Sequence, residues 1–168
     1  MRFSVTMSRF VVAVFLTLGA ATSLGSMGCG ASVIPNTDVP DTGDNRSVVD
    51  FCEQYRKAVE EKNVGLILKM THPSYHEDGG NADGTDDLDF NGFKDYLTTT
   101  FAKTESIRHE VRYRRISVTQ THRFQIDYTF TASFKIPGVK GDEWKNVVAD
   151  NRLELVRSGE SYKIISGM

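Results

Sequence analysis

Hydrophobic and polar positions change their period once along the chain, from a helical spacing to a strand spacing. Over residues 47–62, six apolar positions recur at steps of three and four, opposite a charged stripe. They are Val48, Phe51, Cys52, Tyr55, Ala58 and Val59. This pattern predicts an amphipathic helix, and Ser47 and Asp50 have the spacing of a capping box. Shorter helices are predicted over 64–70 and, with Asp89 as cap, over 90–104.

From residue 107 the period becomes two. Residues 123–136 alternate strictly between polar and apolar, which predicts a strand with one buried face. Residues 107–118 alternate too, but the phase slips at Arg114-Arg115, which predicts a β-bulge. Two further strands are predicted over 144–156 and 161–167, with Thr121-His122 and 137–142 as breaks and 74–77 as a short extra strand. The predicted class is α+β: three N-terminal helices packed on a curved, mainly antiparallel sheet of four to five strands.

The first 28 residues have the pattern of an export signal. Met1 to Phe10 carries two arginines and no acid, and no charged residue follows until after Ile34. An apolar stretch, Val11 to Leu18, leads into small residues, as in secretory signal peptides. We therefore expect an exported protein of the cell envelope. An uncleaved membrane anchor is the rival interpretation, since the uncharged run is long enough to span a bilayer.

Gly28-Cys29 resembles the lipobox of bacterial lipoproteins, although Ser26 and Met27 differ from its usual residues. The resemblance implies that Cys29 carries a lipid that anchors the chain to a membrane, facing the periplasm or the cell surface. Ordinary cleavage nearby is the alternative. Residues 29–46 are rich in Pro, Asp, Asn, Thr and Gly, so we expect a flexible tether there and a folded domain over 47–168.

Net charge, cysteine content and the absence of several motifs limit the functions that the sequence supports. The net charge is −2, and about −4 without Arg2 and Arg9, which argues against nucleic acid as a partner. Cys52 falls within a helical pattern and is expected to be a buried hydrophobe rather than a reactive thiol. The sequence has no G-x-S-x-G, P-loop, H-E-x-x-H or C-x-x-C motif, and we predict no cofactor.

The order of elements resembles the nuclear transport factor 2-like, or SnoaL-like, superfamily of cone-shaped α+β domains. An opening helix with Phe51, Tyr55 and Val59 precedes a short helix at Leu66-Ile67-Leu68, and long strands end at 162–167. The resemblance covers residues 47–168. It implies a cone with an apolar pocket, in a superfamily of isomerases, dehydratases and binding modules. It therefore implies a small apolar ligand but no particular reaction.

Polar residues on apolar strand faces are the candidates for a site, because a buried polar group needs a partner. The candidates on strands are His109, Tyr113, Tyr128 and Asn151, and Tyr55 on the apolar face of the first predicted helix joins them as a pocket candidate. They could orient a small ligand, and His109 is the candidate general acid or base. The alternative is that backbone or water satisfies each of them near a sheet end.

Two loop segments carry side chains of the kinds that bind metal ions. His72, His76 and Glu77 could bind a transition metal, but Pro73 prevents one helix from carrying both histidines. The acids of 77–89 could bind calcium, but Gly79 and Phe90 stand at the strong-ligand positions of an EF-hand loop. We predict no metal, and interpret the acidic stretch as a lid over the pocket mouth. The basic strip of Arg108, Arg112, Arg114 and Arg115 is interpreted as a solvated face, with an acidic partner or lipid head groups as the alternative.

Three functional hypotheses follow. The first is an anchored, non-catalytic lipoprotein whose cone binds a small molecule or a protein. The second is an isomerase or dehydratase that uses His109, which requires another titratable or hydroxyl group within about 3 Å of the imidazole in a closed cavity. The third is an accessory subunit that forms a homodimer through the polar sheet face around Arg112 and Asp127, with a filled cone.

Overall fold

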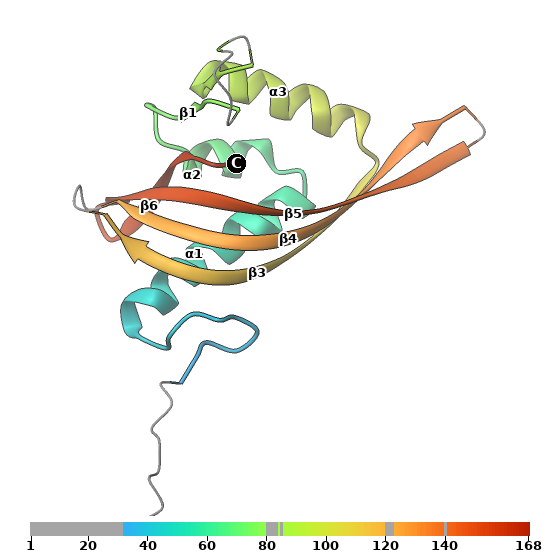
Figure 1. The fold of residues 1–168 in the computed structure, drawn as a ribbon. Coiled ribbons are helices and arrows are strands. Elements are labelled where there is room, and N and C mark those ends of the chain that lie inside the picture. The colour runs from blue at the N-terminus through green and yellow to red at the C-terminus, as the bar shows by residue number, and fades with distance from the viewer. Residues whose placement is uncertain (1–31, 80–83, 85, 120–122, 140) are drawn as a thin grey trace, which may run out of the picture. The chain divides into compact units, whose positions relative to one another are not determined.

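The strands predicted after residue 106 form a single curved antiparallel sheet (Figure 1). The computed structural model describes residues 32–79, 84, 86–119, 123–139 and 141–168, all within one compact unit, 31–168. The strands lie in the order β3-β4-β5-β6. Their bounds are β3 (Ser106–Val118), β4 (Phe124–Gly138), β5 (Gly141–Ser158) and β6 (Ser161–Ser166).

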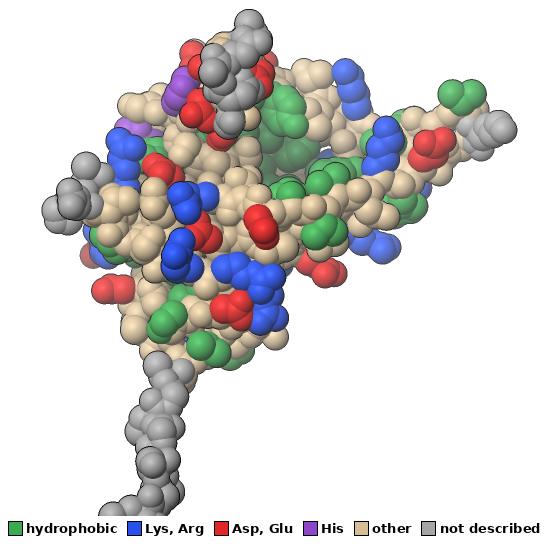
Figure 2. Space-filling model, in the orientation of Figure 1, with side chains coloured by type: hydrophobic (Ala, Val, Ile, Leu, Met, Phe, Trp, Pro, Cys, Tyr) green, Lys and Arg blue, Asp and Glu red, His purple; other side chains and the backbone are tan. Residues whose placement is uncertain are grey.

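Strict alternation along β4 gives the sheet an apolar inner face and a polar outer face. Ile126 and Tyr128 on the inner face are buried, at 0% and 5% exposure. The predicted bulge in β3 is confirmed, because Tyr113 pairs with Tyr128 and the next pair is Arg115 with Asp127. Basic and acidic side chains intermingle on the outer face (Figure 2).

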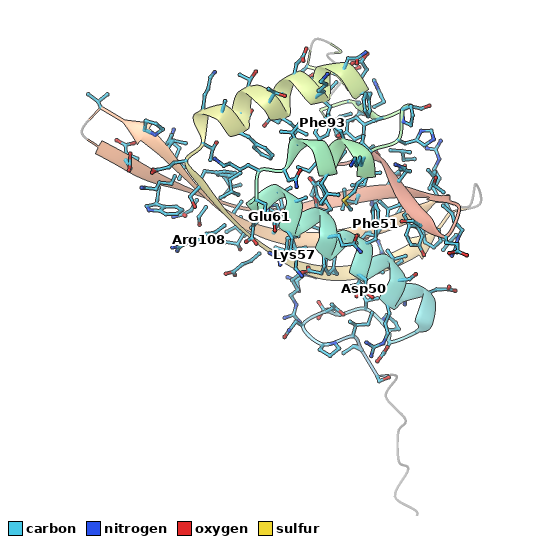
Figure 3. All side chains as sticks on the ribbon, turned by 180° about the vertical axis from the view of Figure 1, so that it is seen from behind. Asp50, Phe51, Lys57, Glu61, Phe93 and Arg108 are labelled. Carbon is cyan, nitrogen blue, oxygen red and sulfur yellow. The ribbon has the colours of Figure 1, made fainter. Side chains whose placement is uncertain are left out.

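Two helices, α1 (Gly43–Glu60) and α2 (Val64–Met70), cover part of the inner face, with α1 lying along β3 (Figure 3). α1 begins four residues before the predicted start, so the capping box at Ser47 was wrong. Thr42 is the cap instead, and its hydroxyl oxygen accepts a hydrogen bond from the Asn45 amide at 3.2 Å. Ser47 lies inside the helix, and its hydroxyl is 2.8 Å from the hydroxyl of Tyr162.

The segment predicted as a flexible tether is folded from residue 32 onward. Val33 and Pro40 form an antiparallel bridge, and Ile34 and Val39 bury their side chains in the core. The amide of Asp38 donates to the carbonyl of Tyr113 at 2.9 Å, which ties this loop to β3. The two apolar side chains supply the burial that a free tether lacks. The predicted signal peptide, residues 1–28, and Cys29 lie outside the described residues.

The third helix, α3 (Phe90–Lys103), follows a two-stranded sheet of β1 (His76–Glu77) and β2 (Leu88–Asp89). The helices therefore do not all precede the strands, and the extra strand does not join the main sheet. Asp89 caps α3 as predicted, accepting from the Gly92 amide at 2.8 Å. No helix in the described part of the chain is long and apolar enough to cross a membrane.

β4 and β5 continue as a two-stranded arm beyond the other strands (Figure 1). The predicted break at 137–142 is shorter than expected, because Pro137 still pairs with Asp142. Pairing of β3 with β4 ends at Lys135, so the missing amide hydrogen of proline interrupts no ladder with β3. The predicted turn at Thr121-His122 lies outside the described residues.

Candidate ligand-binding site

A recess separates α3 from the inner face of the sheet. α3 packs on α2 and β2 and has no comparable contact with the main sheet in the described part of the chain. Figure 2 shows a hollow between α3 and β5 that is lined largely by hydrophobic side chains. Apolar inner-face residues that remain partly exposed are Phe130, Phe134, Val147 and Ala149, and α3 presents the half-exposed Tyr96. We call this hollow the inner recess.

His109 brings an imidazole to the inner face of β3. Its backbone is fixed from both sides, because its amide donates to Glu60 Oε1 at 2.9 Å and its carbonyl accepts from Arg56 at 3.0 Å. Its ring stacks on Phe130 at 5.5 Å between centroids. Burial, with the nearby Arg56 guanidinium, lowers the pKa of His109.

The imidazole nitrogens of His109 have no hydrogen-bond partner among the described residues. Among the described residues, every side-chain nitrogen or oxygen that is buried from solvent has a hydrogen-bond partner. The nitrogens of His109 are therefore reached by solvent, and one of them can bond a ligand. The acid–base partner that an enzyme requires within about 3 Å is missing from the described residues.

Tyr55 is the second open polar group. It lies on the apolar face of α1 and is partly exposed, and its hydroxyl has no hydrogen-bond partner among the described residues. Burial, with the neighbouring Tyr128 and Tyr75, raises the pKa of Tyr55 well above its ordinary value. Tyr55 thus points into a group of tyrosine rings and offers a neutral hydroxyl.

Tyr113 has a structural role. It is 3% exposed, and its hydroxyl donates to Glu53 Oε1 at 3.0 Å. The Glu53 carboxylate also accepts from Arg56 at 2.8 Å. Burial raises the pKa of Tyr113, so the phenol stays neutral. Tyr113 therefore braces α1 against β3.

Tyr128 and Asn151 both donate to the carbonyl oxygen of Gly167, at 3.3 Å and 3.4 Å. The amide of Gly167 in turn donates to Glu77 Oε2 at 2.5 Å, and the same oxygen accepts from the hydroxyl of Tyr75 at 3.2 Å. Gly167 therefore locks β1 to the inner face. Of the five predicted pocket residues, Tyr113, Tyr128 and Asn151 hold the fold together, while Tyr55 and His109 have open polar groups.

The predicted sheet-face partners Arg112 and Asp127 are both engaged within the chain. Arg112 and Arg114 bind Asp38 at 2.5 Å and 2.9 Å, and Arg115 and Arg152 bind Asp127 at 2.7 Å and 2.6 Å. Arg108 stacks on Trp144, with its guanidinium carbon 4.8 Å from the ring centroid. These pairs neutralise most of the basic strip without an outside partner.

The loop histidines do not form a metal centre with their neighbours. Within the described residues no three His, Cys, Asp or Glu side chains could hold an ion together. His76 lies 3.7 Å from Asp87, and His72 Nδ1 accepts from the Ser74 amide at 3.1 Å. Both histidines line an open cleft of about 860 Å³ beside β6. The stretch 77–89, considered for calcium, falls partly outside the described residues.

Sequence reasoning missed Glu77, Gly167 and Tyr96. The sequence places Glu77 in a short strand, among possible metal ligands and in an acidic loop, whereas its observed role depends on a contact with a residue 90 positions away. The sequence predicts Gly167 only as the end of the last strand. Tyr96 lies three residues after the buried Phe93 on α3, and its own exposure of 54% depends on how α3 packs, which the sequence alone does not show.

Comparisons with known proteins address the fold. No family model and no curated protein matches the sequence. A candidate scytalone dehydratase from Novosphingobium aromaticivorans superposes with a TM-score of 0.62 at 8% identity, covering 74% of this chain and 80% of the other. A candidate dehydratase of the nuclear transport factor 2-like family from Streptomyces avermitilis gives 0.62 at 13% identity, covering 74% and 93%.

A third match is a candidate calcium/calmodulin dependent protein kinase II association domain from Xanthomonas campestris. Its TM-score is 0.59 at 15% identity, and the match covers 80% of this chain and 94% of that one. Identities this low establish architecture and not activity. The described part of the chain thus has the nuclear transport factor 2-like, or SnoaL-like, fold that the order of its elements predicted.

Proposed function

We propose that this domain is a non-catalytic module that binds a small, flat, uncharged ligand in the inner recess. The observation that carries the proposal is the pairing of open polar groups with apolar walls. Tyr55 and His109 offer polar atoms that have no hydrogen-bond partner among the described residues, and Phe130 and Ala149 offer partly exposed apolar surface. Ligand sites combine mostly apolar walls with a few polar groups in this way.

The expected charge of the ligand follows from the two polar groups. The lowered pKa of His109 and the raised pKa of Tyr55 keep both side chains neutral near pH 7. A charged ligand would lose hydration in the recess without gaining an opposite charge there. An uncharged ring system would pack against the apolar walls of the inner recess, and one hydrogen-bonding group on it would pair with Tyr55 or His109.

An isomerase or dehydratase activity remains the second candidate, because a depressed histidine pKa is common at catalytic sites. It requires a bound ligand to bring a second titratable or hydroxyl group within about 3 Å of the His109 imidazole. A crystal structure of a ligand complex distinguishes the two. Under our proposal the imidazole contacts the ligand alone.

We also propose that the protein is exported and lipid-anchored through Cys29. This rests on the charge and hydropathy pattern of the first 28 residues and on Gly28-Cys29. Intact mass of protein extracted from membranes tests it. Loss of residues 1–28 with an added acyl mass supports the proposal, whereas an unmodified Cys29 contradicts it.

The binding proposal can be tested with the uncharged fluorescent probe N-phenyl-1-naphthylamine. Ala149→Trp should fill the inner recess from β5 and reduce probe affinity at least tenfold. Thr131→Trp is the matched control, because Thr131 is exposed on the outer face of the neighbouring strand. Equal binding by both variants, or no saturable binding by the wild type, contradicts the proposal.

A further inference from the structure

The folded part of the chain begins a short distance from the proposed lipid. Only two residues separate Cys29 from Ser32, the first residue that the structure describes. Three steps of about 3.8 Å between consecutive Cα atoms reach at most about 11 Å, whatever conformation the chain adopts. Ser32 opens the folded loop 32–42, so a lipid on Cys29 would keep this loop at the bilayer surface.

The loop 32–42 is fixed to the rest of the domain. The carbonyl of Ser32 accepts a hydrogen bond from the amide of Asp41 at 2.7 Å, and a second backbone hydrogen bond ties the loop to β3. Ile34 and Val39 are buried in the core, at 7% and 0% exposure. Because the loop cannot swing freely, its position at a bilayer would also determine which surfaces of the domain point away from the membrane.

The exposed side chains of the loop suit contact with lipid head groups. Val33 is 51% exposed, and Pro35 and Pro40 are also exposed. Membrane affinity scales with the apolar area that becomes buried, so three such side chains add little affinity of their own. The lipid would therefore supply the binding, and the loop would supply the surface that meets the membrane.

The two charges of the loop are compensated within the domain. Arg46 binds Asp41 at 2.6 Å, and two arginines of β3 bind Asp38 at 2.5 Å and 2.9 Å. Contact with head groups would therefore remove no unpaired charge of the loop from water. The next charged residue along the chain, Asp44, is acidic, so the contact gains nothing from anionic lipids.

We propose that the loop 32–42 is the surface with which the anchored protein meets the membrane, and that the inner recess opens toward the aqueous side. The inference rests on the proposed lipid at Cys29. The loop is tied to β3 at one edge of the sheet, whereas α3 and β5 bound the recess. Figure 1 and Figure 3 show the loop and α3 at opposite ends of the domain. The ligand therefore enters the recess from water and not from the bilayer.

Fluorescence quenching tests this inference on the protein extracted from membranes and reconstituted in vesicles of phosphatidylcholine and phosphatidylglycerol, with a nitroxide on some head groups. Val33→Cys and Val139→Cys are matched variants, because both valines are exposed, at 51% and 102%, and Val139 lies at the tip of the β4–β5 arm. With Cys29 acylated and Cys52 buried, only the introduced thiol takes a nitrobenzoxadiazole label. Quenching at position 33 should exceed quenching at position 139 at least threefold, in low and in high salt.

A longer connection should remove the effect. A Gly/Ser insert of about 12 residues after Ala31 has a root-mean-square length of about 20 Å, and it should reduce quenching at position 33 to the level at position 139. Unchanged quenching at position 33 in this variant overturns the inference, because the short connection would then not be its cause.

Intact mass of each sample separates this inference from the proposed anchor. If Cys29 carries no acyl mass, the anchor fails and the inference fails with it. If Cys29 is acylated and position 139 is quenched as strongly as position 33, the anchor stands and the inference is overturned. Quenching at position 33 that high salt abolishes also overturns it, since this would indicate attraction of the basic strip to anionic head groups.

Discussion

The imidazole of His109 is stacked on the phenyl ring of Phe130, with centroids 5.5 Å apart and planes inclined by 13°. The two residues lie on neighbouring strands, since Phe130 pairs with Val111, two residues along β3 from His109. The stack holds the imidazole against an apolar wall and leaves its nitrogens open. An apolar wall disfavours the charged imidazolium, which agrees with the lowered pKa of His109.

His109 should make the domain less stable in mild acid. Its folded pKa lies below the ordinary value of 6.5, so the unfolded chain takes up this proton more readily. The contribution to stability is complete above pH 6.5 and falls as pH drops toward the folded pKa. NMR titration should give a pKa below 6.5 for His109. His109→Phe keeps an aromatic ring on Phe130 and should flatten the dependence of Tm on pH in this range, whereas an unchanged slope contradicts this reasoning.

Asp38 should stabilise the folded N-terminal loop in a different pH range. Hydrogen bonds from Arg112 and Arg114 lower the pKa of Asp38 from 3.8 to about 2. Its contribution is therefore present above pH 3.8 and lost as pH falls toward 2. Asp38→Asn should lower Tm slightly at neutral pH, and the difference from wild type should vanish near pH 2. Glu160→Gln, which removes one negative charge at an exposed turn, is the control for the change in net charge.

Alanine substitutions at two glycines with positive φ should distinguish the cost of backbone strain from the cost of steric overlap. Gly167 has a φ of +87°, and a Cβ there would overlap the carbonyl oxygen of Arg152. Gly159 has a φ of +63° and no atom within 4 Å of a built Cβ. Gly159→Ala should cost about 1–2 kcal/mol of unfolding free energy, the cost of the left-handed backbone alone. Gly167→Ala should cost about 4 kcal/mol, since it adds a clash and disturbs the bonds to Tyr128 and Glu77. Similar losses in urea unfolding would contradict this assignment.

Cys52 should be unreactive in the folded protein. It is 1% exposed, and burial raises the pKa of its thiol. Because the thiolate is the reactive form, alkylation should proceed only through unfolding. Peptide mass spectrometry after iodoacetamide treatment should show Cys52 modified in urea and unmodified in native buffer. Rapid modification of Cys52 in native buffer would contradict its placement in the core.

The sequence predicted the elements that local patterns encode. Alternation along 123–136 identified the strand and its buried face, and the phase slip at Arg114-Arg115 identified the bulge. The cap at Asp89 followed from residue type and spacing. Each of these depends on neighbours within a few residues, which a single sequence displays.

Features that depend on distant contacts were missed. Residues 29–46 have the composition of a tether, in which Ile34 and Val39 are isolated apolar residues. Only their packing against the core makes this segment part of the fold from residue 32 onward. Likewise, the five pocket candidates are one helix residue, Tyr55, and four polar residues of the strands. Nothing local distinguishes Tyr113, whose hydroxyl binds Glu53, from Tyr55, whose hydroxyl has no partner in the described part of the chain. The inner recess itself arises because α3 packs on α2 and β2. The hydrophobic pattern of the sequence does not predict this arrangement.

The most direct test of the inner recess is a set of intermolecular nuclear Overhauser effects between N-phenyl-1-naphthylamine and the isotopically labelled chain. Our account predicts contacts from the probe to the rings of His109, Phe130 and Tyr55, with saturation at one probe per chain. Contacts confined to outer-face residues such as Trp144, or none at all in a sample that binds the probe, would contradict it.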